Sequence, residues 1–265
     1  MQLTVGGLFA PGARALILQP HYDDAALSCG GAAAKIAQLG QADILTVFAS
    51  ELAPGMVGDF AAWKHERWRI EDPDQLVAAR REEDAQAAAV LGCRLRWLGF
   101  PDAIYRGENY GSDLELFGLM HPDEQVLVEH LALEVRGLPE WSPDATVLVP
   151  LGIGMHVDHQ LVFETGRILA QNGVRVLAYE DAPYVIHTPL GLEERLAQVG
   201  DALEAPILVP ISDVLETKIE AIGCYASQVP VIFRFTADYA AAVRGFAVER
   251  GGALGPAERF WPLRA

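Results

Sequence analysis

Cysteine, basic side chains and long apolar runs are all scarce in this chain of 265 residues. The three cysteines, Cys29, Cys93 and Cys224, are far apart in the sequence and form no CxxC pair. A disulfide framework is therefore not expected, and we predict a protein of a reducing compartment, the cytoplasm. No apolar run approaches the roughly 18 residues of a membrane-spanning helix. The N-terminal residues also lack the basic region and apolar core of a signal peptide.

Positive charge is in short supply, with 20 Lys and Arg against 36 Asp and Glu and a formal net charge of -16. Nucleic acid and anionic membrane surfaces bind through clustered Lys and Arg. We therefore expect neither nucleic acid nor a membrane as partner. A small neutral sugar or an amine stays compatible with this charge.

Short apolar runs alternate along the chain with longer segments of helical periodicity. The runs are rich in Val, Ile and Leu and mostly lack polar alternation, which is typical of strands buried on both faces. We expect strands at residues 14–19, 43–48, 94–98, 145–149, 174–179 and 205–209, and helices at residues 24–39, 74–91, 122–137, 157–171, 191–198 and 212–226. This order predicts an α/β fold with a doubly wound, mostly parallel sheet and helices on both faces.

Two long segments interrupt this alternation. Residues 50–74 and 99–121 are mixed in composition and are expected to be irregular, and loops of this length are often functional. The tail after Pro230 is expected to hold a helix near residues 236–250 and then a coil with Trp261. We find no repeat, low-complexity tract or linker, so the prediction is a single domain over residues 1–265.

The most informative pattern is a pair of polar clusters, each following an apolar run. His21-Tyr22-Asp23-Asp24 follows the expected strand 14–19, and His156-Val157-Asp158-His159 follows 145–149. If the strand order is 3-2-1-4-5, the first and fourth strands are neighbours, and ligands bind outside their carboxyl ends. The two clusters would then face each other. Imidazole and carboxylate are the ligand types of a catalytic zinc ion.

These residue types allow specific roles to be assigned. A catalytic zinc site keeps three protein ligands and an open position for water, and we expect these ligands to be His21, Asp24 and His159. Asp23 is then free to act as general base towards the metal-activated water. His156 is expected to stabilise the oxyanion or to protonate the leaving amine. Asp158 is expected to fix the tautomer of an imidazole. Two nitrogens and one carboxylate do not exclude another divalent metal.

Each residue taken alone also has a simpler interpretation. Asp23 or Asp24 would suit the N-terminus of a helix starting near Ala25, where a carboxylate accepts from free N–H groups. A single His at such a turn is more often an ordinary polar residue than a ligand. The presence of two such clusters at two strand ends favours a metal site.

The two clusters look like the signature motifs of the PIG-L/LmbE-like zinc-dependent N-deacetylases, commonly His-Pro-Asp-Asp-Glu and His-Pro-Asp-His. The likeness covers about residues 14–228. It continues through Gly30-Gly31, Arg80-Arg81-Glu82-Glu83, Leu98 to Asp102, Tyr179 to Tyr184 and Tyr225 to Gln228. The resemblance implies a Rossmann-like fold with zinc at the strand ends and hydrolysis of an N-acetyl group. The resemblance implies the same three zinc ligands, the same general base and the same role of His156 as the residue types do.

The resemblance also implies substrate-binding residues. One Arg of the pair Arg80 and Arg81 matches a substrate-contacting arginine, and Asp102 matches a carboxylate that meets sugar hydroxyls in some members. The simpler interpretations are a solvated helix face for the arginines and a Pro-Asp turn for Asp102.

The sequence departs from the family pattern at three places. Ala25 stands where many members have Glu, and Tyr22 replaces the common Pro. Gly154-Met155 precedes the second motif, where some members place a tyrosine near the reacting carbonyl. If stabilising the oxyanion needs more than the zinc ion and His156, another residue must provide the additional contact.

The function predicted on these grounds is removal of an N-acetyl group from an amino sugar or a related small-molecule conjugate, by a zinc-dependent amidohydrolase. Cleavage of a larger acyl amide, of the thiol-sugar conjugate type, is the alternative at the same site. A non-catalytic metal- or carbohydrate-binding module is disfavoured because base and ligands are all present. A nucleotide-binding domain is disfavoured because no GxGxxG opens the first helix. The substrate and the acyl group stay open, and so does assembly into a homo-oligomer.

Overall fold

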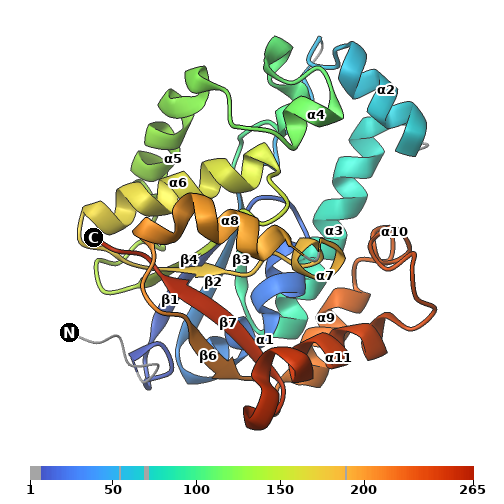
Figure 1. Cartoon of the computed structure of the whole chain (residues 1–265). Helices are drawn as coiled ribbons and strands as arrows, with labels where there is room; N and C mark the ends of the chain where they lie inside the picture. Colours follow the sequence, from blue (N-terminus) through green and yellow to red (C-terminus); the bar gives the residue numbers. More distant parts are fainter. Residues whose placement is uncertain (1–6, 54, 69–71, 189) are drawn as a thin grey trace.

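The protein is built around one mixed sheet flanked by helices (Figure 1). The computed structural model describes residues 7–53, 55–68, 72–188 and 190–265. The sheet has the order β3-β2-β1-β4-β5-β7-β6. Its strands are β1 (Arg14–Gln19), β2 (Gln41–Thr46), β3 (Arg94–Trp97), β4 (Thr146–Pro150), β5 (Arg175–Tyr179), β6 (Ile207–Pro210) and β7 (Ala257–Pro262). Strands β1 to β5 are parallel, whereas β7 runs antiparallel to β5 and β6.

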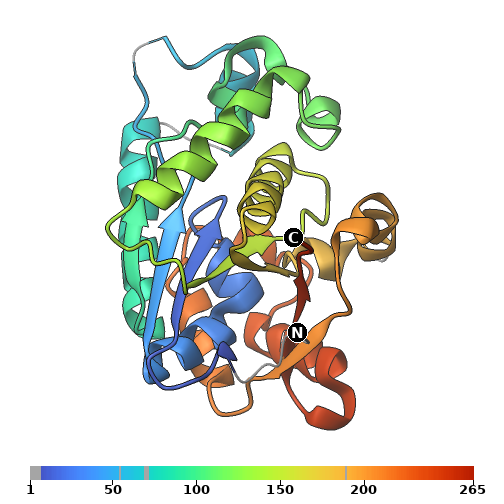
Figure 2. The same ribbon diagram turned by 90° about the vertical axis from the view of Figure 1, so that its left-hand side faces the viewer.

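Helices cover both faces of the sheet (Figures 1 and 2). One face carries α1 (Asp24–Leu39), α3 (Pro73–Leu91), α9 (Leu215–Gly223) and α11 (Tyr239–Gly251). The other carries α5 (Gln125–Gly137), α6 (Val157–Gln171) and α8 (Gly191–Val199). The other α-helices of the described residues are α2 (Asp59–Trp68), α4 (Asp113–Leu116), α7 (Tyr184–His187) and α10 (Val229–Ile232). In the described ranges, no helix is both long and apolar enough to cross a bilayer.

The predicted fold class is confirmed, and so is the order 3-2-1-4-5 for the first five strands. The main helices lie where they were expected, and α11 confirms the helix expected near residues 236–250. The helix expected at residues 212–226 is shorter and forms α9. The prediction of an irregular segment at residues 50–74 was wrong in part, because α2 lies within it.

The expected coil around Trp261 is instead the strand β7. The strand was not predicted because it contains two charged residues, and their ion-pair partners are known only from the folded protein. Buried Glu258 accepts from Lys218 Nζ at 2.6 Å, and Arg259 pairs with Glu180. Glu258 also accepts from the N–H groups of Gly31 and Ala32, where α1 is kinked at Cys29.

A buried carboxylate fastens α3 to the sheet. Asp84 accepts hydrogen bonds from Gln19 Nε2 (2.9 Å), Thr46 Oγ1 (2.7 Å), Trp97 Nε1 (2.9 Å) and Tyr225 Oη (2.9 Å). Burial raises the pKa of Asp84 to about 6, and these four donors oppose the shift. Gln19 in turn accepts from the Ala25 N–H at 3.0 Å, at the start of α1. The network therefore holds the turn that carries His21 and Asp24.

The substitution Asp84→Asn tests this network. The introduced amide NH2 group would face donors, so buried hydrogen bonds would be lost at a cost of about 1–3 kcal/mol. Glu82→Gln, an exposed position on the same helix, is the matched control and should stay within about 0.5 kcal/mol of the wild type. Urea unfolding measures both. Equal stability of the two variants would contradict this account of the network.

Candidate metal and catalytic site

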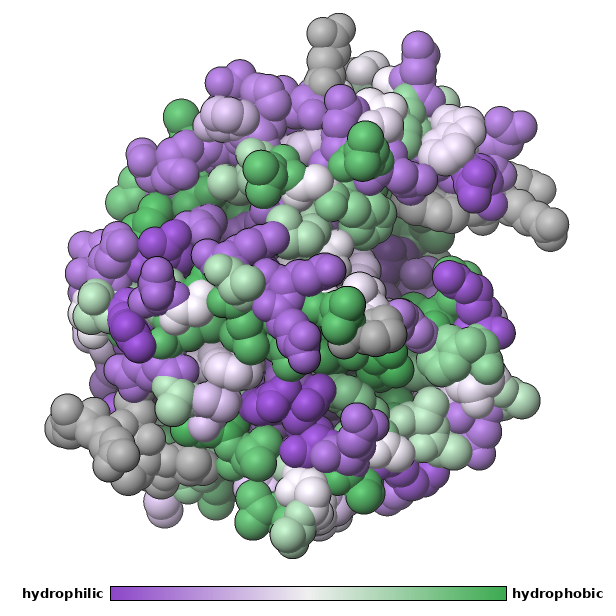
Figure 3. Space-filling view, viewed as in Figure 1, coloured by the Kyte–Doolittle hydropathy of each residue, from purple (hydrophilic) through white to green (hydrophobic). Residues whose placement is uncertain are grey.

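The two polar clusters meet at the carboxyl ends of β1 and β4, which are neighbours in the sheet. The first cluster and His156 of the second line a cavity of about 530 Å³. The surface is hollowed between the region of α2 and α4 and that of α10 (Figure 3). The ends of the two strands and the following helices therefore bring distant parts of the chain to one site, as the assumed strand order predicted.

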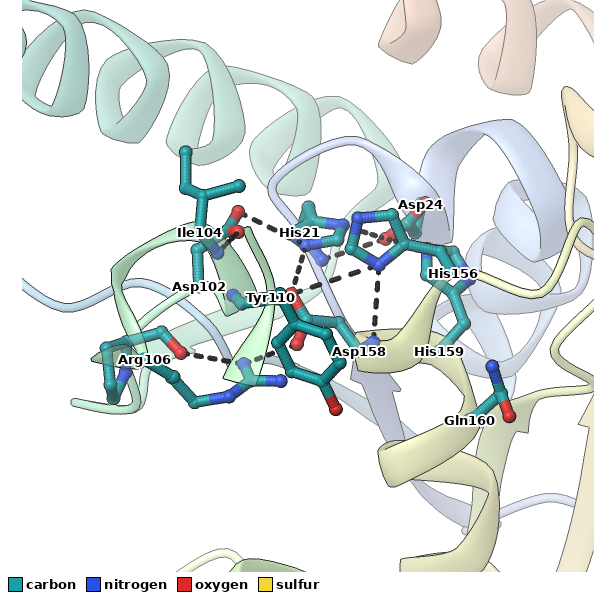
Figure 4. Close-up of polar contacts among 12 residues, drawn as sticks. His21, Asp24, Asp102, Ile104, Arg106, Tyr110, His156, Asp158, His159 and Gln160 are labelled. Carbon is teal, nitrogen blue, oxygen red and sulfur yellow. Dashed lines mark hydrogen bonds and ion pairs between the residues drawn. The ribbon is translucent and has the colours of Figure 1, made fainter. Parts of the chain in front are cut away.

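Three of the predicted residues form a compact ligand set. The Asp24 Oδ2 atom lies 3.5 Å from His21 Nδ1 and 3.5 Å from His159 Nε2. The candidate ligand atoms of the three residues all lie within 4.8 Å of one another. Figure 4 shows these side chains converging from the turn after β1, the start of α1 and the start of α6. This is the geometry expected of three ligands that share one ion.

The protonation and bonding of His159 fit a metal at this place. Its Nδ1 atom lies 2.7 Å from Asp181 Oδ1, so the carboxylate accepts from an N–H there. Its Nε2 atom is buried and has no hydrogen-bond partner among the described residues. A bare, buried nitrogen aimed at Asp24 and His21 is costly unless it is coordinated.

Asp181 was not predicted from the sequence as a site residue. Its Oδ2 atom accepts from the N–H groups of Gly152 (2.8 Å) and Ile153 (3.0 Å), which leaves Oδ1 for His159. A signal did exist, since Asp181 closely follows the buried strand β5, at the same edge of the sheet as the two clusters. Residues 179–184 belong to the likeness seen in the sequence, but no role was predicted for Asp181.

Asp158 does orient an imidazole, and that imidazole is His21. Asp158 Oδ2 lies 2.9 Å from His21 Nε2 and accepts from the Ala103 N–H at 3.2 Å, whereas His156 Nδ1 is 3.9 Å away. Arg106 Nη1 donates to Asp158 Oδ1 at 2.5 Å. Burial opposes ionisation of Asp158, but Arg106 and the histidines hold its pKa well below the usual range.

Arg106 is a second residue that sequence reasoning missed. It also pairs with the buried Glu124 at 2.6 Å, and Tyr110 donates to the same carboxylate at 2.7 Å. These partners come from the segment 99–121 and the start of α5, so only the folded chain reveals the network. Figure 4 shows the connection from Arg106 through Asp158 to His21.

His156 lines the cavity and is held in one tautomer. Its Nδ1 atom accepts from the Asp158 N–H at 3.2 Å, so Nε2 carries the proton in the neutral ring. Burial lowers the pKa of His156 well below its ordinary value. It is therefore a neutral hydrogen-bond donor at neutral pH.

Neither aspartate of the first cluster caps α1 with its side chain. Asp23 occupies the N-cap position without a side-chain cap bond, and Asp24 Oδ2 accepts from the His21 N–H at 2.8 Å. The simpler helix-cap interpretation is therefore wrong for both. Burial raises the pKa of Asp23, and Arg80 Nη2, at 3.3 Å from Asp23 Oδ2, opposes that shift.

The two arginines of α3 point to different places. Arg80 lines the cavity beside Asp23 and lies over the Tyr22 ring. Arg81 does not line the cavity and donates to the Ala49 carbonyl at 2.8 Å and to Glu51 at 3.0 Å. Of the predicted pair, the structure brings only Arg80 to the cavity, because successive helical residues lie about 100° apart.

Asp102 is a turn residue whose side chain also lines the cavity. Its Oδ1 atom accepts from the Ile104 N–H at 3.2 Å, as a turn residue does. Its Oδ2 atom lies 3.4 Å from His21 Nε2, and the side chain lines the cavity. One oxygen therefore shapes the loop while the other faces the site.

The predicted rim segments do border the cavity, through Lys64 of α2 and through Ile104, Tyr105, Leu116 and Phe117. His65 Nε2 lies 2.7 Å from Tyr105 Oη, and Lys64 pairs with Asp113, so the two segments are joined. The opposite wall comes from α7 and residues 228–234.

The sheet and the two clusters match the family resemblance seen in the sequence, and comparison with known proteins confirms it. Residues 16–170 match the family model described as PIG-L, GlcNAc-PI de-N-acetylase, which is more than half of the chain. The chain therefore belongs to the PIG-L family, and it is a hydrolase of the N-deacetylase class.

Individual relatives agree with this assignment. The chain is 32% identical over 224 residues to the 2′-N-acetylparomamine deacetylase of Streptomyces fradiae, covering 81% of this chain and 73% of that protein. The crystal structure of the A40926 pseudoaglycone deacetylase matches with 26% identity and a TM-score of 0.76, over 95% of this chain and 97% of the other. The zinc-inhibited form of teicoplanin deacetylase matches with 25% identity and a TM-score of 0.78, over 95% and 98%.

The contact between Asp181 and His159 predicts how metal affinity responds to substitution. Asp181→Asn removes the charge behind the imidazole and should weaken zinc binding about 10- to 100-fold, the usual effect of losing such a partner. His159→Ala should abolish stoichiometric binding. Asp201→Asn, at an exposed position, is the control and should bind as the wild type does.

Competition with a chromogenic chelator measures the zinc affinity of each variant. Unchanged affinity in Asp181→Asn would show that Asp181 does not support the ligand. Full zinc occupancy in His159→Ala would show that the ligand set is a different one.

Proposed function

We propose that this protein is a metal-dependent amidohydrolase that removes the acetyl group from an N-acetylated amino sugar. The observation that carries the proposal is the candidate ligand set of His21, Asp24 and His159. Two of these residues, His21 and Asp24, line a cavity together with Asp23 and His156. A cavity of about 530 Å³ is within the usual range for small-molecule sites. The relatives named above carry out deacetylation of 2′-N-acetylparomamine and of the A40926 pseudoaglycone, which supports this substrate class.

The three ligands would hold zinc or another divalent ion. When bound, the ion supplies a Lewis acid that polarises the acetyl carbonyl and makes a neighbouring water more acidic. The bare Nε2 atom of His159 and the Asp24 carboxylate suit such an ion. Although burial raises the pKa of Asp24, the neighbouring His159 and His21 lower it to about 2, so the carboxylate is charged at neutral pH.

The remaining residues move protons and bind charge. Asp23 accepts a proton from the attacking water, whose oxygen forms the new bond to the acetyl carbon. Its Arg80 partner at 3.3 Å keeps the carboxylate aimed into the cavity. His156 donates from Nε2 to the carbonyl oxygen as it becomes negative. The C–N bond then breaks, and the proton taken up by Asp23 passes to the leaving amine, so acetate and a free amino sugar are released.

We also propose that residues 1–265 act as one deacetylase domain. The strand β7 near the C-terminus lies between β5 and β6, and Glu258 on β7 reaches α1 near the N-terminus. Dividing the chain between the two motifs and the C-terminal residues would therefore separate strands of one sheet. The expected partner is a small N-acylated molecule.

Acetate release tests the function directly. Zinc-loaded protein should release acetate from 2′-N-acetylparomamine or N-acetylglucosamine, and chelation should abolish release. Release of a larger acid from long-chain N-acyl analogues, without release of acetate, would favour the alternative amidase. Full turnover by metal-free protein would overturn the proposal.

Asp23→Asn tests the general base. The variant keeps the size of the side chain but cannot take up the proton of water, so kcat should fall at least about 100-fold. Zinc affinity should stay near that of the wild type, because Asp23 is not one of the three ligands. Steady-state kinetics and metal titration on the same preparation separate the two effects. A variant with wild-type kcat would assign the base elsewhere.

A further inference from the structure

A tyrosine from outside the two motifs lies beside the ligand set. Tyr184 begins α7, three residues after Asp181, and lines the cavity. Its ring packs edge-on against the His159 ring, with centroids 5.5 Å apart. Phe117 contacts both Tyr184 (6.4 Å) and His156 (5.2 Å). The phenol therefore shares its surroundings with the residue that is proposed to bind the carbonyl oxygen.

The loop that precedes the second motif leaves room for this ring. A Cβ atom on Gly154 would lie 2.4 Å from Tyr184 Cδ1 and 2.6 Å from its Cγ, so a side chain at residue 154 and the ring exclude each other. Gly154 also has φ +84, and Met155 has φ 64, in the left-handed region that non-glycine residues rarely adopt. Backbone of this kind persists where the surrounding structure enforces it, often at functional sites.

The Tyr184 hydroxyl is free for a ligand. Among the described residues, no hydrogen bond engages it, whereas the hydroxyls of Tyr105, Tyr110 and Tyr225 are bonded to His65, Glu124 and Asp84. A phenol keeps its proton at neutral pH, so this hydroxyl is a hydrogen-bond donor.

The segment that carries Tyr184 is firmly held. The Val185 N–H donates to the Asp181 carbonyl at 2.9 Å, and the Ala182 N–H donates to Ser28 Oγ at 3.0 Å. The Asp181 side chain is fixed by the Gly152 and Ile153 N–H groups. Asp181 thus contacts His159 through its carboxylate and holds the Tyr184 segment through its main-chain carbonyl. Donors fixed in advance are the ones that stabilise transition-state charge most effectively.

We propose that Tyr184 is a further catalytic residue, whose hydroxyl donates a hydrogen bond to the acetyl carbonyl oxygen as the carbon becomes tetrahedral. This inference rests on the proposed function. The phenol transfers no proton. It shares the developing negative charge with His156 Nε2–H, and the bond weakens again when the C–N bond breaks and the carbonyl reforms.

Tyr184→Phe removes the hydroxyl and keeps the ring that packs on His159. With 2′-N-acetylparomamine as the probe, or N-acetylglucosamine if it is turned over faster, kcat should fall about 100-fold, the usual loss for one such donor. KM should change less than about threefold, and zinc affinity should not change. Tyr239→Phe, which removes a hydroxyl remote from the cavity, is the matched control and should leave kcat unchanged.

A second measurement does not depend on turnover. The methylphosphonyl analogue of the same amino sugar carries a tetrahedral anion in place of the acetyl group. Its Kd should rise in Tyr184→Phe by about the factor lost in kcat/KM, whereas the Kd of the deacetylated amine should not change.

The outcomes are distinguishable. Wild-type turnover with an unaffected Tyr184→Phe would overturn this inference alone. A loss of kcat accompanied by equal loss of zinc affinity would show that the ring only supports His159, and would overturn it as well. A wild type that neither releases acetate from either probe nor binds the phosphonyl analogue would overturn the proposed function together with the inference.

Discussion

The site depends on one buried carboxylate, that of Asp158. With no exposed surface, it accepts from the imidazole of His21, the backbone of Ala103 and the guanidinium of Arg106, and so joins β1, the segment 99–121 and α6. A buried charge without partners is very costly, and removing one member of a buried pair usually costs several kcal/mol. The three segments are therefore held together by the same contacts that position His21, the candidate ligand.

Buried acidic side chains also form ion pairs between distant elements elsewhere in the molecule. Glu258 of β7 pairs with Lys218 of α9 and accepts from α1 at the kink near Cys29, while Glu180 after β5 pairs with Arg250 of α11. Each buried acid links elements that are far apart in the sequence. These pairs fix the antiparallel end of the sheet beside the segment that carries Asp181 and Tyr184, so that the wall of the cavity opposite α2 is built on a rigid support.

Much of the site could be predicted because its residues lie close together in the sequence, in two clusters. His21 to Asp24 and His156 to His159 are short runs at the ends of apolar strands, and parallel strands deliver their carboxyl ends to one edge. Asp181, Arg106 and Tyr184 were not predicted as site residues, although Asp181 and Tyr184 lie in a segment that matches the family pattern directly after β5. Their importance comes from contacts with His159, Asp158 and the space beside Gly154, which a sequence does not display. Likewise β7 was not predicted, because its two charged residues find their ion-pair partners only in the folded protein.

The sequence by itself determined the alternation of strands and helices, the mostly parallel sheet and the ligand types at two strand ends, because periodicity and residue chemistry are local properties. It did not decide which nitrogen of each histidine faces the candidate metal site. It also did not decide which of Arg80 and Arg81 reaches the cavity, or that Asp158 contacts His21. Those outcomes were decided by tertiary structure, since a buried polar atom is satisfied by whatever donor or acceptor the packing brings within about 3 Å. That donor or acceptor can come from any part of the chain.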